Sequence, residues 1–167
     1  TLLELMISVT VLIIIVTIAV PNTTALIEKY QSKTAISTLK SILTQTRALA
    51  LELESHITAC PINNSRCQNQ WDEPITVFID HNSNQIIDQN EQVFFSVKMD
   101  ISTGYWQKKR INAPFIRFTP EGHAFSTATT FLYCPYSDRL NLAKQLIINF
   151  QGRIRVNNYL SSRGTPY

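Results

Sequence analysis

Residues that build metal centres and hydrolytic sites are scarce in this sequence. Its 167 residues include three histidines and three cysteines. They form no Cys-x-x-Cys pair and no histidine pair at metal-ligand spacing. No serine or cysteine stands in a recognisable nucleophile context. We therefore expect no enzyme activity, no bound metal and no cofactor.

The start of the sequence also lacks the basic charge with which a secretory signal peptide begins. No Lys or Arg precedes the apolar run Leu2–Val20, and no Ala-x-Ala cleavage site follows it. About 20 apolar residues, at roughly 1.5 Å per residue, are enough to cross a hydrocarbon core of about 30 Å. The run predicts a transmembrane helix over residues 1–21 rather than a cleaved leader.

After Pro21 the apolar residues recur at steps of three and four, which is typical of a helix with one core-facing stripe. We expect this amphipathic half to cover residues 22–54 and to continue the membrane helix. Pro21 lacks an N–H and crowds the preceding turn, so a kink or a loosened turn is expected there. The stripe consists of Leu26, Tyr30, Leu39, Ile42, Leu43, Thr46, Leu49, Ala50 and Leu53.

Over residues 55–167 the pattern changes to short runs typical of strands, separated by polar, Asn-rich or Pro-containing segments. Gln151-Gly152 lies between the last two runs and predicts a tight turn. The predicted fold class is α+β, with one long N-terminal helix packed on a small antiparallel β domain. The expected strands are His56–Cys60, Ile75–Asp80, Val93–Met99, Phe115–Thr119, Thr130–Cys134, Gln145–Phe150 and Arg153–Val156.

The odd number of cysteines leaves one without a partner if the β domain lies in an oxidising compartment outside the inner membrane. A segment suited to a turn separates Cys60 from Cys67, and we expect these two to form the disulfide. Cys134 would then be the free thiol. The competing pair is Cys60–Cys134, which would bridge two strands.

Glu4 is the one charged residue in the apolar run. A carboxylate in hydrocarbon is costly unless it finds a partner, so such a residue is by default a functional hypothesis. No Lys, Arg or His lies within a helical turn of it, which leaves a chain terminus or another subunit as its partner. The alternative is a helix-end carboxylate that reaches the lipid headgroups.

The segment from Thr1-Leu2-Leu3-Glu4 to Val20-Pro21 resembles the mature N-terminus of type IV pilins and pseudopilins. The signature of that family is Phe-Thr-Leu-x-Glu, and this sequence begins at the Thr. The resemblance implies cleavage by a prepilin peptidase, N-methylation and assembly with other pilin subunits. It assigns assembly to Thr1 and Glu4, with Glu4 pairing with the amine of a neighbouring subunit.

The rest of the chain is similar to one branch of these proteins, the FimT/FimU/GspH group of minor pilins. Some members of the group bind DNA in natural transformation, and a C-terminal Gly-Arg-x-Arg motif is associated with that role. The same motif also occurs in members with other roles. The matching segments are Cys60-Pro61, Cys67, Trp71, Val77–Asp80, Glu91, Phe115–Phe118, Gly122, Phe131–Cys134 and Gly152-Arg153-Ile154-Arg155.

Basic residues prevail toward the C-terminal end. On a strand, Arg153 and Arg155 would point to one face about 7 Å apart, close to the spacing of adjacent phosphates. We expect them to bind the DNA backbone regardless of sequence, together with Gly152 and Arg163. The alternatives are charge that guards an exposed edge strand against aggregation, and a contact with another protein. From Gly122 onward the only acid is Asp138, against Arg139, Lys144, Arg153, Arg155 and Arg163.

Lys108, Lys109 and Arg110 form a second basic cluster, beside Tyr105 and Trp106. Aromatic stacking combined with phosphate contacts is how proteins hold single strands. The cluster is therefore a candidate second DNA contact, and the competing interpretation is a solvated loop.

Residues 80–91 carry oxygen ligands at several positions of a calcium loop. Gln85 stands where the sharp turn of such a loop requires Gly, and the flanking segments are predicted strands. We therefore expect no calcium in this loop.

Together these patterns predict a minor pilin of a type IV pilus that contributes to DNA binding and uptake. It would lie first in the bacterial inner membrane, with the β domain in the periplasm, and then in the pilus at the cell surface. Its expected partners are other pilin subunits, the inner membrane and DNA. The alternatives are a minor pseudopilin of a type II secretion system and a structural tip or priming subunit that acts through protein contacts.

Overall fold

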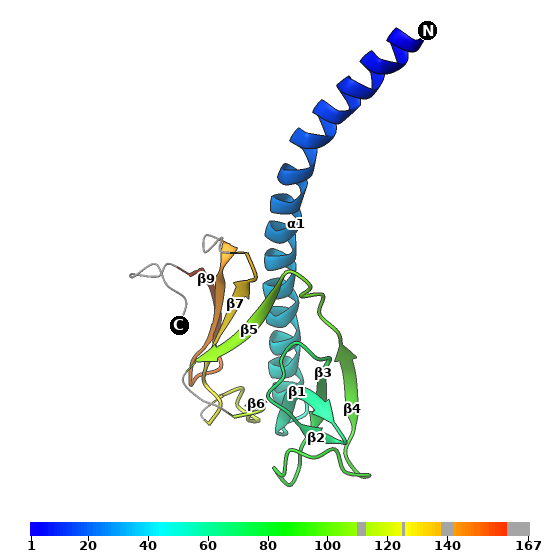
Figure 1. Ribbon diagram of the computed structural model, residues 1–167. Coiled ribbons are helices and arrows are strands. Elements are labelled where there is room, and N and C mark those ends of the chain that lie inside the picture. The colour runs from blue at the N-terminus through cyan, green and yellow to red at the C-terminus, as the bar shows by residue number, and fades with distance from the viewer. Residues whose placement is uncertain (110–112, 125, 138–141, 160–167) are drawn as a thin grey trace.

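The computed structural model describes residues 1–109, 113–124, 126–137 and 142–159, and the side chains of residues 18–22 are outside this description. Helix α1, Leu2–Glu52, is unbroken, so it passes through Pro21 where the sequence predicts a kink or a loosened turn. Figure 1 shows it as one curved rod whose N-terminal half extends beyond all the strands. The helix ends two residues before the predicted limit, because Glu54 turns the chain with a positive φ of 47°.

The free half of α1 leaves its large apolar side chains exposed, from Leu2 to Val16. No helix within the described part of the chain is long and apolar enough to cross a membrane. The predicted span Leu2–Val20 includes residues 18–20, whose side chains lie outside the described part.

Five strands form the first sheet, and all their pairings are antiparallel. The order along the sheet is β2-β1-β3-β4, and β6 also pairs with β1. The strands are β1 (Ile57–Asn63), β2 (Arg66–Cys67), β3 (Ile75–Ile79), β4 (Val93–Val97) and β6 (Ile116–Phe118).

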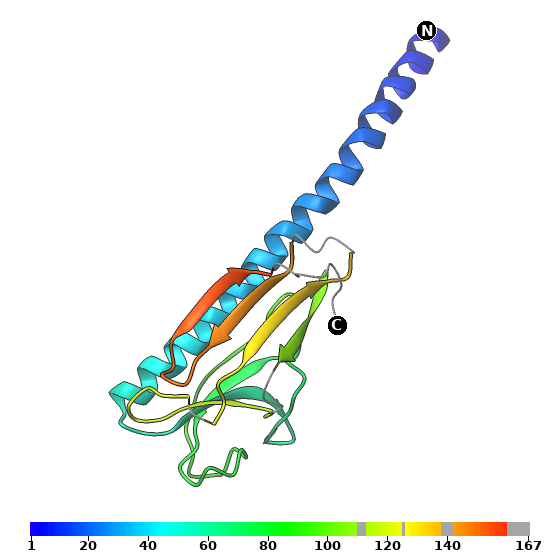
Figure 2. The ribbon, with the colours of Figure 1, turned by 90° about the vertical axis from the view of Figure 1, so that its left-hand side faces the viewer.

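Four further strands form the second antiparallel sheet, in the order β5-β7-β8-β9. Figure 2 shows its orange and red strands, β8 and β9, lying along the lower half of α1. Strand β9 is an edge of this sheet. The strands are β5 (Gly104–Lys109), β7 (Thr130–Pro135), β8 (Lys144–Ile148) and β9 (Ile154–Asn158).

The core lies between the lower half of α1 and the two sheets. Leu39, Ile42 and Leu43 on the helix are buried against residues of both sheets. Fully burying one such side chain contributes about 1.5–3 kcal/mol. A chain of ring contacts crosses between the sheets: Trp71 touches Phe131, which touches Trp106, which touches Tyr133. The C-terminal half of the predicted helical stripe therefore holds the two sheets together.

Two further parts of the sequence prediction are wrong. Leu26 and Tyr30 of the predicted stripe are exposed, because the sheets begin to cover the helix only near Ser32, whose hydroxyl donates to the Leu142 carbonyl. Leu53 of the stripe is exposed as well, because it lies beyond the end of α1. Strands β2 and β5 have no counterpart among the predicted strands, and β5 places Lys108 on a strand rather than in a solvated loop.

Candidate nucleic-acid interface

The two arginines of the Gly-Arg-x-Arg motif lie at the hairpin that joins β8 to β9. Its turn is closed by a hydrogen bond from the Gly152 amide to the Asn149 carbonyl, 2.9 Å. The Asn149 amide donates to the Arg153 carbonyl at 3.2 Å, and Asn149 Oδ1 accepts from the Arg153 amide at 2.7 Å. Arg153 is thereby held just before β9, and Arg155 lies within the strand.

Both arginine side chains are exposed. Arg155 pairs directly with Ile147, whereas the neighbouring pair Ile148 and Ile154 faces the core. Side chains alternate across a strand, so Arg155 points away from α1. Neither arginine takes part in an ion pair with another described residue. The hairpin thus presents two cations that no described carboxylate neutralises.

Arg47, on α1, joins this hairpin to the helix by hydrogen bonds. Its Nε donates to the Gly122 carbonyl at 2.9 Å, and its Nη2 donates to the Gln151 carbonyl at 3.2 Å. Gly152 has φ +73°, and a Cβ placed on it would come within 2.0 Å of the Gly122 carbonyl oxygen. Only glycine avoids that overlap, so the glycine of the motif fixes the hairpin against the body of the protein.

Phe150 sits at the tip of the same turn and is 57% exposed. The sequence prediction placed it at the end of a strand, Gln145–Phe150, but β8 ends at Ile148. Its position immediately before the predicted Gln151-Gly152 turn was a signal that it could lie on the surface. The structure therefore adds an exposed aromatic ring to the arginine hairpin.

Lys108 does not belong to this exposed surface. It is half-buried, and its ammonium lies 5.1 Å from the centre of the Trp71 ring and 5.6 Å from that of Phe131. Its Nζ also donates to the Ala113 carbonyl. Burial lowers the pKa of Lys108 from its ordinary 10.5 to about 8. The lysine predicted as a DNA contact is thus held inside the fold.

The side chain of Lys109 lies on the face of the sheet opposite to that of Lys108. Arg155 lies on the same face of the sheet as Lys109. Cross-strand pairs Lys109–Thr130, Thr130–Ile147 and Ile147–Arg155 place the two cations in one row. Three strand spacings put them about 14 Å apart. The Lys109 ammonium lies 5.0 Å from the centre of the Tyr159 ring, so part of its charge is already engaged. Arg110 and Arg163, the other predicted contacts, lie outside the described residues.

At the far end of the molecule, Glu4 and Thr1 form the first turn of α1. The Thr1 nitrogen lies 3.2 Å from Glu4 Oε2, and the Glu4 amide donates to the Thr1 hydroxyl at 3.4 Å. Both side chains are more than four-fifths exposed, so this is a solvent-accessible contact. The carboxylate therefore remains accessible to a second partner.

The cysteines are arranged in two places. Cys60 on β1 and Cys67 on β2 are joined by a disulfide with a Cα–Cα distance of 5.5 Å. Cys134 is a buried free thiol on β7, and its burial raises its pKa. The disulfide closes the β1–β2 hairpin and lies away from the arginine hairpin.

The loop over residues 80–91 bonds to itself. The side-chain amides of Asn82 and Asn84 donate to Asp88 Oδ2, and the Glu91 carboxylate accepts from the backbone N–H groups of His81 and Asp88. The described residues contain no group of three metal-binding side chains. Buried Asp80, at the start of the loop, pairs with Arg117. These contacts account for the loop as a folded structural element.

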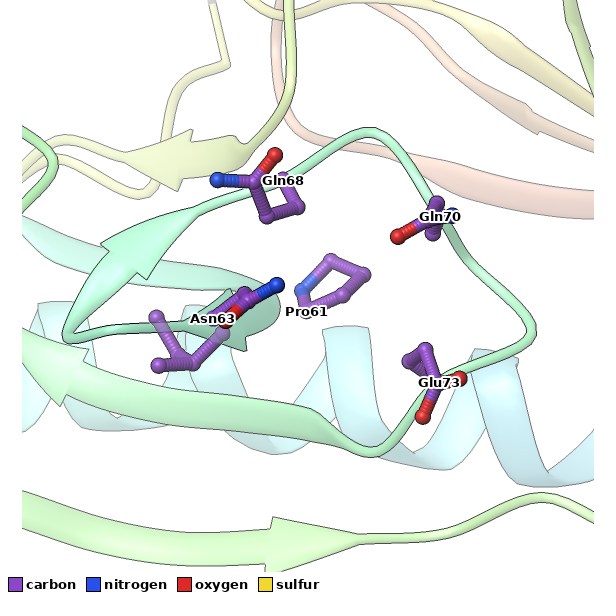
Figure 3. A pocket seen from close by; sticks show the side chains of 6 residues that line it. Pro61, Asn63, Gln68, Gln70 and Glu73 are labelled. Carbon is purple, nitrogen blue, oxygen red and sulfur yellow. The ribbon is translucent and has the colours of Figure 1, made fainter.

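A shallow pocket lies beside the β1–β2 hairpin (Figure 3). Its one ionisable lining residue is Glu73, and no nucleophile or second acid lines the pocket with it. The pocket offers no pair of groups for acid–base chemistry. It is lined by Pro61, Ile62, Asn63, Gln68, Gln70 and Glu73.

A long helix that is packed along one half only, against antiparallel sheets, defines a pilin-like architecture. Two crystal structures of the type IV minor pilin FimU from Pseudomonas aeruginosa are similar in fold over most of this chain. The first superposes with a TM-score of 0.62 at 18% identity, over 78% of this chain and 90% of FimU. The second, in another crystal form, gives 0.53 at 19% identity, over 75% and 91%.

The sequence itself identifies the family. Residues 35–152 match the family described as Type II transport protein GspH. This match covers more than half of the chain, and the chain therefore belongs to the GspH family. No curated protein matches it significantly. Family and fold together indicate a type IV pilin-like subunit that acts through assembly, and they support the predicted FimT/FimU/GspH resemblance and the α+β fold.

Proposed function

We propose that this subunit is a minor pilin that binds DNA through the β8–β9 hairpin and contributes to DNA uptake. The observation that supports the proposal is the pair Arg153 and Arg155, exposed together and without a described carboxylate partner. Arginine forms strong charge-assisted hydrogen bonds with phosphate, and two exposed arginines on one hairpin, two residues apart, can contact neighbouring phosphates. Phosphate contacts carry little sequence information, so binding should be sequence-tolerant.

The alternative for the same two residues is protection of an edge strand. β9 is an edge of the second sheet, and charge there would discourage pairing with another chain. The two explanations differ in what the arginines do for DNA and for solubility. Replacing both arginines separates them.

The test is a titration of labelled duplex DNA with the full chain in non-ionic detergent, at two salt concentrations. Arg153→Gln with Arg155→Gln should weaken binding to all sequences alike and flatten the log–log salt slope by about two, since each lost phosphate contact contributes about one. Stability should change by less than about 0.5 kcal/mol, because both side chains are exposed.

Lys144→Gln is the matched charge control, because Lys144 is engaged with Asn158 on the adjacent strand. If the folded double variant binds DNA as well as the wild type, the two arginines do not bind DNA and the proposed DNA role is contradicted. Increased aggregation with unchanged DNA affinity would instead identify the edge-protection role.

For assembly, we propose that residues 1–21 anchor the chain in the inner membrane and that Glu4 pairs with the amine of a neighbouring pilin. The exposed Glu4 carboxylate supports this, because it is accessible to a cation of a neighbouring subunit. Glu4→Gln keeps the side-chain length and removes the charge. The variant should stay in the membrane fraction and be lost from sheared filaments. Wild-type amounts in the filaments would contradict the assembly role.

The family description favours one second candidate, a minor pseudopilin of a type II secretion system. Such a subunit would need the assembly helix but no DNA-binding site. Full-length protein that assembles through Glu4 and fails to bind DNA in the titration would fit this function.

A further inference from the structure

Phe150 is an exposed aromatic residue of the β domain, on the same hairpin as the two arginines. At 57% exposure it leaves much of its ring in water, and it is not a member of the described hydrophobic clusters. It precedes Arg153 by three residues, within a turn whose ends are hydrogen-bonded. Even a fully extended chain would separate their Cα atoms by only about 10 Å. An exposed aromatic ring and two exposed cations therefore lie on one hairpin.

The tip is held from several directions, so Phe150 is not exposed merely because its loop is loose. The Phe150 carbonyl accepts from the Ala124 amide at 2.9 Å. The next carbonyl, that of Gln151, accepts from Arg47, and the Gln151 side chain accepts from Asn149 Nδ2 at 2.7 Å. The cost of ordering the backbone that carries the ring is therefore met during folding, before any ligand binds.

We propose that Phe150 stacks on an unpaired base while Arg153 and Arg155 hold the flanking phosphates, so that the hairpin binds single-stranded DNA more tightly than duplex. This inference rests on the DNA-binding function proposed above. Base–aromatic stacking tolerates every base, which agrees with sequence-tolerant phosphate contacts. In a duplex the base faces are already stacked, and reaching one requires unstacking. The arginines can grip either form, whereas Phe150 can engage only the single strand.

The test uses the full chain in non-ionic detergent and three labelled probes of equal length, about 20 nucleotides. The probes are oligothymidylate, a duplex, and an abasic strand that keeps the phosphates without bases. Phe150→Ala should weaken oligothymidylate binding about tenfold, within the range of one lost base stack. Binding of duplex and of the abasic strand should stay within about twofold, because only phosphate contacts remain there.

Substitutions at the same position separate stacking from hydrophobicity and from folding. Phe150→Trp keeps an aromatic face and should keep the preference for oligothymidylate. Phe150→Leu keeps an apolar side chain and should lose it. Tyr30→Ala removes an aromatic ring of similar exposure, 61%, on α1 and should leave all three affinities unchanged. Circular dichroism of each variant checks that the fold is kept.

The outcomes distinguish this inference from the function on which it rests. Equal loss of all three probes in Phe150→Ala, or no loss in any, overturns the stacking role while the arginine grip stands. Retained single-strand preference in Phe150→Leu also overturns it. If the wild type binds none of the three probes, both the stacking role and the DNA-binding function fall.

Discussion

Two basic segments lie in the same four-stranded sheet, and the fold treats them in opposite ways. On β5, Lys108 is enclosed by Trp71 and Phe131 and donates to a backbone carbonyl. At the opposite edge, Arg153 and Arg155 are exposed and make no ion pair with a described residue. In the sequence both segments look like basic patches. In the structure the Lys108 ammonium is enclosed, whereas the side chains of Arg153 and Arg155 are exposed.

The difference comes from strand register and from what covers each face. Lys108 and Lys109 are neighbours, so they point to opposite faces of β5. The face that receives Lys108 is packed with aromatic rings, and a lysine stem can cover such rings while its ammonium finds one acceptor. The arginines follow a turn in which Gly152 packs closely against the Gly122 carbonyl, and both arginine side chains are exposed. Charge therefore marks an interface only where the fold leaves it unpartnered.

Removing the Lys108 side chain should give the largest effect on this contrast. Lys108→Ala takes away a stem that packs on Trp71 and Phe131, and it should lower the free energy of unfolding by about 2 kcal/mol. DNA affinity of the folded variant should not change, because Lys108 faces the core. Chemical denaturation and the duplex titration measure the two quantities on the same protein.

The arginine double variant supplies the converse control, with DNA affinity lost and stability kept. A folded Lys108→Ala protein that binds DNA several-fold more weakly would break the contrast, since it would make β5 part of the interface. A loss of stability as large in Lys108→Met, which retains the stem, would show that the charge rather than the packing stabilises the sheet.

Local patterns in the sequence were enough to predict the helix, most strands and the position of the arginine hairpin. They failed where a residue depends on a distant one. Strand β5 has polar residues on both faces, so it shows no alternation, and the burial of Lys108 depends on Trp71 in another part of the chain. Arg47 donates hydrogen bonds to Gly122 and Gln151, which lie 75 and 104 positions further along the chain. Exposed Leu26 and Tyr30 show the same limit, because the helical stripe continues past the point where the sheets stop covering it.

A further expected effect is a rise of stability with pH that comes from the buried lysine. Lys108 has a pKa of about 8 in the folded protein and an ordinary value of 10.5 once unfolded, because burial penalises its charged form. Between these values the unfolded chain binds more protons, so Lys108 makes stability rise with pH. Burial raises the pKa of the Cys134 thiol and of Tyr133, and these groups make stability fall as pH rises through the same range. The contribution of these two groups to the pH dependence of the free energy of unfolding has to be subtracted to obtain that of Lys108.

Lys108→Met removes the lysine titration and leaves those of Cys134 and Tyr133 in place, so the difference between wild type and variant isolates Lys108. We expect the free energy of unfolding of the wild type, relative to that of Lys108→Met, to rise by about 2 kcal/mol between pH 8 and 10.5. Below pH 7 this difference should not change with pH. Arg153→Gln with Arg155→Gln should follow the wild-type curve throughout, since guanidinium groups stay protonated. Urea denaturation at several pH values gives these curves. A difference that is flat across the range would show that the Lys108 ammonium is as well solvated as the exposed arginines, and the contrast between the two basic segments would then rest on packing alone.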